Sequence, residues 1–476
     1  MTRVSVGVIL AIVSLFSSAL FAGPVKKEKQ NQPNILFILS DDHSVPFLGC
    51  YGYPVKTPNL DKLAKEGIIY NRAHTTAPQC VLSRAAIMTG RSTLDIRMTR
   101  FTAPLLPDVI SYPELLRKGG YYTGICGRNF HLNGARTTAV SEEVFDKYKL
   151  ETFKNRVDYL KTTGNIDSIY YQYNDFLNTV PRGKPFFLQL GYSDPHRIFN
   201  AKEFEPDPDT IKIPEGWPDT KLLRKDFAGY LGEIQRLDHE VGKVFEELKR
   251  RGLDKNTLIV FMGDNGGALV RGKGTLYKLG LNVPLIMRHA DLIKPGQVSN
   301  ILVSGEDIAP TFLQVAGITS PKEFTGVSLV PSFQGKPFQV HEYIYAVRGA
   351  HGSGLPTNTA HFDLGRTVIS DRYKLIYNAL WQLPYYPVDF SGQPFWLELQ
   401  QLHNEGKLEE KWDKLLFSAR RSMFELFDEQ ADPNEFNNLS GKPEYKEIEE
   451  KLKDKLQEWM ILNEDYLPLP VIPRPR

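Results

Sequence analysis

The feature that most constrains the fold is an unbroken apolar run near the start of the chain. Residues 34–39 read Asn-Ile-Leu-Phe-Ile-Leu and have polar residues on both sides. Such a run, with no alternation of polar and apolar residues, is typical of a parallel strand that is covered on both faces of its sheet. A polar segment with Asp41 and Asp42 follows directly, at the end of the strand where open α/β sheets place their ligands.

The same pattern recurs along the first two thirds of the chain. Further strands are predicted at residues 121–126, 185–190, 257–262 and 283–287. Helices are predicted at residues 57–67, 80–90, 111–120, 223–250 and 307–316. This alternation predicts an α/β fold, a large doubly wound and mostly parallel sheet with helices on both faces.

The pattern changes after residue 335. Short segments at residues 343–347, 366–369, 373–377 and 423–427 predict a small antiparallel sheet, and residues 443–462 predict a terminal helix that packs on it. We therefore expect a large domain over residues 33–335 and a smaller C-terminal α+β subdomain over residues 336–476.

The first 22 residues have the features of a secretory signal peptide. Arg3 precedes an apolar run over residues 4–16, and small residues lead to Ala22. The run is too short for a stable membrane span, so we expect an exported protein, periplasmic or secreted. The 58 basic and 56 acidic residues leave a net charge of only +2, which does not indicate a nucleic-acid partner.

Cys80 begins the stretch that carries the chemistry. Residues 80–91 read Cys-Val-Leu-Ser-Arg-Ala-Ala-Ile-Met-Thr-Gly-Arg, which predicts a short helix ending at Gly90. Cys80 is then at the helix entrance, where free N–H groups favour an anion, and Arg84 lies one turn further on the same face. In isolation, such a pair would more often be a buried thiol beside a surface arginine. The other cysteines, Cys50 and Cys126, could pair or remain buried thiols, so the fold does not depend on disulfides.

Two polar loops predict a metal site. Asp41 and Asp42 follow one predicted strand, and Asp264 and Asn265 follow another one far along the chain. Together they form an all-oxygen ligand set of the kind that Ca²⁺ or Mg²⁺ prefers. Each segment alone would more often be a turn or a helix cap.

The order of residues around Cys80 resembles the maturation motif of type I sulfatases, in the alkaline phosphatase superfamily. The match is C-x-x-S-R followed by T-G-R, with Leu82 where the family usually has proline or alanine. The resemblance implies that Cys80 is oxidised to formylglycine (3-oxoalanine), whose hydrate is the nucleophile. A formylglycine-generating enzyme or an anaerobic sulfatase-maturating enzyme would be the partner for this step.

Three other segments extend the resemblance. Residues 124–131 are similar to T-G-x-x-G-K-W-H, with Arg128 in place of lysine and one extra residue before His131. Residues 187–197 are similar to the segment ending in D-P-H-R and contain His196. Residues 272–286 are similar to G-K-x-x-L-Y…V-P-L-I and contain Lys273. The similarity continues through residues 423–439, so it spans most of the chain after the signal peptide.

The resemblance implies a role for each site residue. One Ca²⁺ ion would be held by Asp41, Asp42, Cys80 in its modified form, Asp264 and Asn265. Arg84 and Arg128 would hold the charged nucleophile in place. His196, assisted by Lys273, would protonate the leaving oxygen, and His131 would help to expel sulfate from the enzyme.

Within the family, the chain most resembles heparan N-sulfatase (sulfamidase) and the bacterial polysaccharide sulfatases. This implies an exported sulfatase that acts on a sulfated carbohydrate, either an algal glycan such as ulvan, carrageenan or fucoidan, or a glycosaminoglycan. N-desulfation of glucosamine is the alternative. Less favoured are a phosphodiesterase of the same superfamily and, if Leu82 prevents maturation, a non-catalytic sulfated-glycan-binding protein. Arg348, His351, His361 and Arg366 are candidates for sugar contacts.

Overall fold

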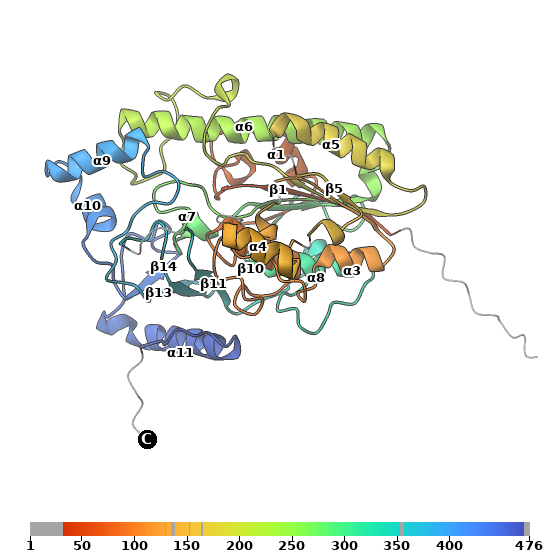
Figure 1. The fold of residues 1–476 in the computed structure, drawn as a ribbon. Coiled ribbons are helices and arrows are strands. Elements are labelled where there is room, and N and C mark those ends of the chain that lie inside the picture. The colour runs from red at the N-terminus through yellow and green to blue at the C-terminus, as the bar shows by residue number, and fades with distance from the viewer. Residues whose placement is uncertain are drawn as a thin grey trace, which may run out of the picture. The chain divides into compact units, whose positions relative to one another are not determined.

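Strand β1 (Asn34–Ser40) lies inside a large mixed sheet with the strand order β5-β4-β6-β1-β7-β8-β2-β9 (Figure 1). The computed structural model describes residues 32–128, 130–134, 139–151, 153–162, 165–352 and 357–470. The other strands of this sheet are β2 (Ile68–Tyr70), β4 (Tyr122–Gly127), β5 (Tyr159–Leu160), β6 (Phe186–Gly191), β7 (Thr257–Gly263), β8 (Leu285–Arg288) and β9 (Gln297–Ser299). Strands β3 (Ala73–His74) and β10 (Val303–Ser304) form a separate parallel pair.

Helices cover both faces of the large sheet, as predicted. The helices are α1 (Pro58–Lys65), α2 (Cys80–Thr89), α3 (Tyr112–Lys118), α4 (Ala139–Tyr148), α5 (Ile166–Thr179), α6 (Lys221–Arg250), α7 (Lys278–Leu281) and α8 (Ile308–Val315). In Figure 1, α1, α5 and α6 lie on one side of the sheet and α3 and α8 on the other.

Successive side chains of β1 point into two separate cores. Phe37 packs edge-on against Phe312 of α8 with ring centroids 5.4 Å apart, in the core that also contains Ile35. Leu36 and Ile38 belong to the core on the opposite face, under α1, α5 and α6. Because both faces of the strand are buried, its sequence shows an unbroken apolar run.

The long helix α6 follows the predicted span. The Thr220 side chain accepts a hydrogen bond from the Leu223 amide and so caps the first turn. Its apolar stripe, which includes Leu231, Ile234 and Leu237, is buried against the sheet. The predicted helices that begin near Pro58 and Tyr112 also form, the second with a capping box at Ser111.

One strand of the large sheet is antiparallel to both of its neighbours. Strand β8 pairs antiparallel with both β7 and β2, while β4, β6, β1 and β7 are parallel to one another. A parallel return would need a crossover, usually a helix that packs on the sheet. Between β7 and β8 the chain instead forms loops and the short α7, and these loops reach the site described below.

The C-terminal part forms the predicted antiparallel sheet, with the order β11-β12-β13-β14. Its strands are β11 (Ile344–Arg348), β12 (Gly365–Ile369), β13 (Tyr373–Asn378) and β14 (Phe424–Asp428). Helix α11 (Lys446–Leu462) buries Leu452 and Leu456 against this sheet, and α9 (Pro394–Asn404) and α10 (Glu410–Phe417) lie before β14. The domain boundary at residue 335 stays a prediction.

No helix in the described part of the chain is long and apolar enough to cross a membrane. The predicted signal peptide, residues 1–22, lies outside the described residues.

Candidate active site

Four adjacent parallel strands bring the predicted polar loops to one edge of the sheet. These strands lie in the order β4-β6-β1-β7. Arg128 follows β4, and Asp194 and His196 follow β6. Asp41 and Asp42 follow β1, and Asp264 and Asn265 follow β7. Backbone hydrogen bonds join these loops: the Asp41 amide donates to the Asp194 carbonyl over 3.1 Å, and the Asp264 amide donates to the Ser40 carbonyl over 3.0 Å. The sheet therefore fixes the spacing of side chains that are far apart in the sequence.

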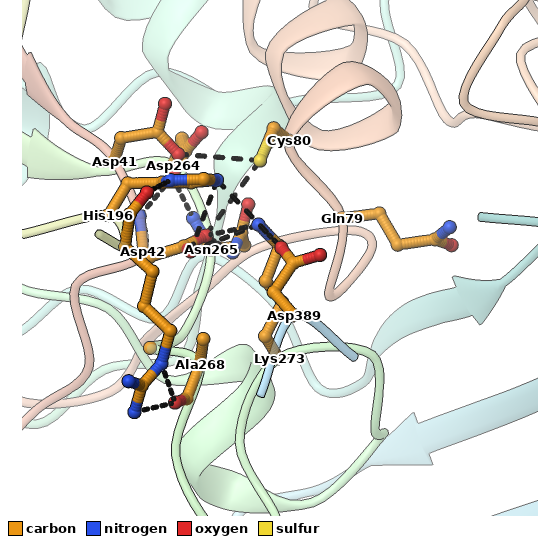
Figure 2. A network of polar contacts seen from close by, with 12 residues as sticks. Asp41, Asp42, Gln79, Cys80, His196, Asp264, Asn265, Ala268, Lys273 and Asp389 are labelled. Carbon is orange, nitrogen blue, oxygen red and sulfur yellow. Dashed lines mark hydrogen bonds and ion pairs between the residues drawn. The ribbon is translucent and has the colours of Figure 1, made fainter. Parts of the chain in front are cut away.

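Helix α2 directs Cys80 toward this edge. Cys80 is the first residue of the helix and is 1% exposed. Its Sγ lies 3.4 Å from Asp41 Oδ1 and 3.8 Å from Asp42 Oδ1 (Figure 2). Burial and the Asp41 carboxylate raise the pKa of the Cys80 thiol well above its ordinary value. An unmodified Cys80 would therefore be a neutral thiol, which is a poor nucleophile.

Arg84 and Arg128 balance the carboxylates beneath Cys80. Arg84 Nε donates to Asp264 Oδ2 over 2.8 Å, and its Nη2 donates to Asp41 Oδ2 over 3.2 Å. Arg128 Nε lies 2.8 Å from the same Asp41 oxygen. Burial alone would raise the pKa of Asp41, but Arg128 and Arg84 hold that pKa well below its ordinary value. Asp41 is thus a carboxylate.

Lys273 enters the site from the long connection after β7. Its Nζ lies 2.9 Å from Asp42 Oδ1. The Gly274 amide donates to the Pro78 carbonyl over 2.9 Å, which ties this loop to the segment just before Cys80. Burial would lower the pKa of Lys273, but Asp42 and other nearby anionic groups raise it overall, so the side chain is an ammonium ion.

The residues of the buried floor fit a divalent cation. Ligand atoms of Asp41, Cys80 and Asp264 all lie within 4.8 Å of one another. Asn265 Nδ2 donates to Asp42 Oδ1 over 2.8 Å, while its Oδ1 is buried and has no hydrogen-bond partner among the described residues. This amide oxygen lies beside three carboxylates and lacks a hydrogen-bond partner, and a cation with oxygen ligands would provide the missing contact.

The structure describes the side chain of only one of the two predicted catalytic histidines. His196 follows β6, and its Nε2 lies 3.7 Å from Asp42 Oδ2 at the partly exposed rim of the site. The side chain of His131 lies outside the described residues, so its predicted role stays a prediction.

Asp389 is a site residue that the sequence analysis missed. It lies in the loop between β13 and α9, and its Oδ2 is 2.7 Å from Lys273 Nζ and 3.8 Å from His196 Nε2 (Figure 2). Its other oxygen lies 3.7 Å from His351 Nε2. Asp389 has a φ of +65°, which is uncommon for a residue other than glycine. No motif or periodicity marks it, because the folding of the second sheet brings it here.

Two of the four predicted sugar contacts are wrong. Arg366 is 2% exposed, and its Nη2 donates to Asp465 Oδ1 over 2.8 Å. Arg348 is 1% exposed and donates to the carbonyl oxygens of Gly349 and Thr359. Both guanidinium groups are used inside the fold, whereas His351 lies next to Asp389.

Solved structures share this architecture. A protein in complex with its substrate D-glucosamine-2-N,6-O-disulfate superposes with a TM-score of 0.69 at 20% identity, covering 91% of this chain and 99% of the other. The phosphonate monoester hydrolase of Silicibacter pomeroyi gives 0.69 at 20% identity, covering 91% and 96%. These similarities show that the chain has the alkaline phosphatase-like fold.

The chain belongs to the Sulfatase family, whose profile matches residues 33–318. A second profile, N-sulphoglucosamine sulphohydrolase, C-terminal, matches residues 271–390 and 396–461. An ulvan-active sulfatase of Formosa agariphila is 31% identical over 92% of this chain and 76% of its own length. Human N-sulphoglucosamine sulphohydrolase is 27% identical, covering 90% and 89%. The protein is therefore a sulfatase, which confirms the resemblance seen in the sequence.

Proposed function

We propose that this sulfatase removes sulfate groups from a sulfated polysaccharide or oligosaccharide, using residue 80 as formylglycine beside a divalent cation. The observation that carries the proposal is the convergence of four strand-end loops and Lys273 on the side chain of Cys80. These groups provide positive charge and hydrogen-bond donors where a sulfate ester would sit, and they are already in place before substrate arrives.

Residue 80 is the proposed site of nucleophilic attack. As a cysteine it is buried and held as a neutral thiol by its surroundings. Oxidation to formylglycine would give a hydrated aldehyde at this position, which supplies an oxygen nucleophile for attack on sulfur. Arg84, one turn further along α2, would hold the neighbouring carboxylates in position through its bonds to Asp41 and Asp264.

The proposed cation would be held by Asp41, Asp42, Asp264, Asn265 and the modified residue 80, and Ca²⁺ suits this oxygen-rich set. When bound, it would supply positive charge to the sulfate oxygens. His196, at the rim, would donate a proton to the leaving oxygen of the sugar, and Lys273 holds Asp42 beside it.

The rim of the site supports a carbohydrate as the leaving group. The side chains of His196, His351 and Asp389 are 18%, 13% and 30% exposed, above a floor of buried charges. A carboxylate and two imidazoles at this rim provide acceptors and donors for hydroxyl groups. The relatives named above are an ulvan-active sulfatase and N-sulphoglucosamine sulphohydrolase, so both O-sulfated and N-sulfated sugars are candidate substrates.

N-desulfation is the second candidate reaction. It is supported by the match of residues 271–390 and 396–461 to the C-terminal profile of N-sulphoglucosamine sulphohydrolase. The segment 271–390 contains His351 and Asp389, so the match covers two of the three side chains at the rim.

The test is sulfate release from a panel of O-sulfated and N-sulfated oligosaccharides by protein coexpressed with a maturation enzyme. We expect release from one class of sulfated sugar, and mass spectrometry should find formylglycine at position 80. Replacing Cys80 with alanine should lower kcat/KM by roughly 10³-fold or more, because the nucleophile is lost.

Cys50→Ser is the matched control, because Cys50 is a free and partly exposed thiol away from the site. It should keep both the activity and the modification. Full turnover by the Cys80→Ala variant would refute the nucleophile. An unmodified Cys80 with retained glycan binding but no turnover would favour a binding protein instead.

Export through residues 1–22 also remains a proposal. N-terminal sequencing of the protein recovered from the cell envelope or medium should begin shortly after Ala22, and a retained Met1 would contradict the signal peptide.

A further inference from the structure

Behind the loop that carries Lys273 lies a small cavity whose walls are rich in arginine. It has a volume of about 40 Å³ and lies between the segment 271–277 and the antiparallel C-terminal sheet. Arg271, Arg348 and Arg421 line it, together with Asp363, Asn378 and Tyr385. The cavity is separate from the side chains that meet at Cys80, and nothing in the proposed reaction uses these three arginines.

Two of these arginines have a hydrogen-bond donor that the fold leaves unused. Arg271 is 4% exposed and Arg348 is 1% exposed. The Arg271 guanidinium lies over the Tyr277 ring, and its Nη2 donates to the Glu435 carbonyl, but its Nη1 is buried and has no hydrogen-bond partner among the described residues. Arg348 Nε is likewise buried and without a partner there, although both Nη atoms of Arg348 donate to carbonyl oxygens. Buried donors of this kind are costly unless something accepts from them.

The charges around the cavity do not balance. Asp363 forms a bidentate ion pair with Arg421, with Nη–Oδ distances of 2.7 and 2.9 Å. Arg271 and Arg348 have no carboxylate hydrogen-bonded to them among the described residues, since they donate only to carbonyl oxygens there. Glu425 lies nearby and receives hydrogen bonds from Tyr277 and Asn378. Even with Glu425 ionised, three guanidinium groups face two carboxylates, which leaves one excess positive charge.

We propose that this cavity is a binding site for a small monovalent anion such as chloride, held by the free donors of Arg271 and Arg348. A single negative charge would neutralise the excess, and the volume is sufficient for a chloride ion. The anion would tie the segment 271–277 to the end of β11, where Arg348 lies. It would thereby hold Lys273 in position from behind.

Bromide provides a direct test on the complete protein. Crystals grown or soaked in sodium bromide should show an anomalous peak in this cavity within hydrogen-bond distance of Arg271 Nη1 and Arg348 Nε. The unfolding temperature should rise by about 1–2 °C for each tenfold increase in bromide above the dissociation constant, relative to sodium gluconate of equal ionic strength, because gluconate is too large to enter.

The variant Arg271→Gln should abolish this bromide-dependent rise, and Arg288→Gln, which changes an arginine away from the cavity, should keep it. The proposal would be overturned if the cavity showed density without an anomalous signal and the unfolding temperatures in bromide and gluconate were identical. That result would mean that water alone fills the cavity. Because neither measurement uses turnover, the outcome is independent of the proposed sulfatase substrate.

Discussion

At the scale of single residues, the site is a chain of alternating charges. Arg84 and Arg128 share Asp41, while Lys273 lies between Asp42 and Asp389. Such buried charges are tolerated because each has an opposite partner in contact. The outermost member, Asp389, is the one whose carboxylate is also exposed to the rim.

Replacing Asp389 with asparagine tests whether this carboxylate contacts the sugar. The substitution keeps the shape but removes the charge, so a hydrogen bond from a sugar hydroxyl to a charged acceptor is lost. We expect kcat/KM to fall by roughly 10- to 100-fold, mainly through a higher KM. Steady-state kinetics on the best substrate of the panel would measure the change.

Asp371→Asn is the control, because the Asp371 side chain is 88% exposed in an ion pair with Arg72. It should leave the kinetics unchanged. If Asp389→Asn lowered kcat alone and left KM intact, Asp389 would act through Lys273 and not through the substrate.

At the scale of secondary-structure elements, helix α2 depends on how it ends. Gly90 closes the helix with a φ of 64°, and its amide donates to the Ala86 carbonyl over 2.8 Å. A methyl group on Gly90 would lie 2.6 Å from a ring carbon of Phe324 and 3.0 Å from the Ala309 side chain. The glycine thus meets both a backbone and a packing requirement at the end of the helix that begins with Cys80.

Gly90→Ala should therefore destabilise the protein by roughly 2–4 kcal/mol, combining left-handed backbone strain with overpacking. Gly252→Ala separates the two causes. Gly252 has a φ of +69° but nothing within 4 Å of an added methyl group, so only the backbone cost of about 1 kcal/mol should appear. Urea unfolding of both variants would measure the difference, and equal losses would contradict the packing argument.

At the scale of the whole molecule, stability should depend on pH through a charge cluster between β6 and α6. Arg236 binds Asp194 through two contacts of 2.8 and 3.0 Å, and it also binds Glu233 at 2.5 Å. Burial raises the pKa of Asp194 to about 7 despite the hydrogen bonds from Arg236, and Glu233 adds to the rise. Two buried carboxyl groups thus share one guanidinium.

This raised pKa sets the sign of the pH dependence. The folded protein binds the Asp194 proton more tightly than the unfolded chain, whose carboxyl has a pKa near 3.8. The contribution is therefore fully present below that value and is lost as the pH rises to about 7. Wild-type stability relative to Asp194→Asn should fall by roughly 4 kcal/mol over this interval, because asparagine does not titrate.

Urea unfolding of wild type and variant at several pH values would measure this difference. Asp219→Asn is the control, because Asp219 is exposed and its hydrogen bonds from Arg224 lower its pKa. The stability of wild type relative to this variant should therefore change only slightly with pH, and it should rise with pH instead of falling. A wild-type-to-Asp194→Asn difference that does not change with pH would contradict the assignment.

Much of the architecture was predictable because parallel strands with two buried faces have unbroken apolar sequences. Residues 34–39 show this pattern, and so do the segments that became β6 and β7. The positions of Asp41 and Asp264 followed from the same rule, since polar residues directly after such strands meet at one sheet edge. The direction of β8 was not readable, because its short sequence is compatible with either pairing.

The sequence did not predict the environments of three polar residues, Asp389, Arg348 and Arg366. All three are polar residues in or near the second sheet, and nothing in the local pattern distinguishes a rim carboxylate from a buried ion pair. Arg366 is neutralised by Asp465, which lies 99 residues further along the chain, so its burial depends on a partner that local sequence does not reveal.

The sequence by itself determined the strands of four or more residues, the helix that begins with Cys80, and the chemical types of the residues that follow the central strands. These depend on local hydrophobic periodicity and on motifs within a few residues. Only the tertiary structure decided which charges became partners, that Asp389 joins the site, and that two arginine donors remain free beside a cavity. The reason is physical: electrostatic energy depends on distances of a few ångströms, and those distances are set by the packing of two sheets.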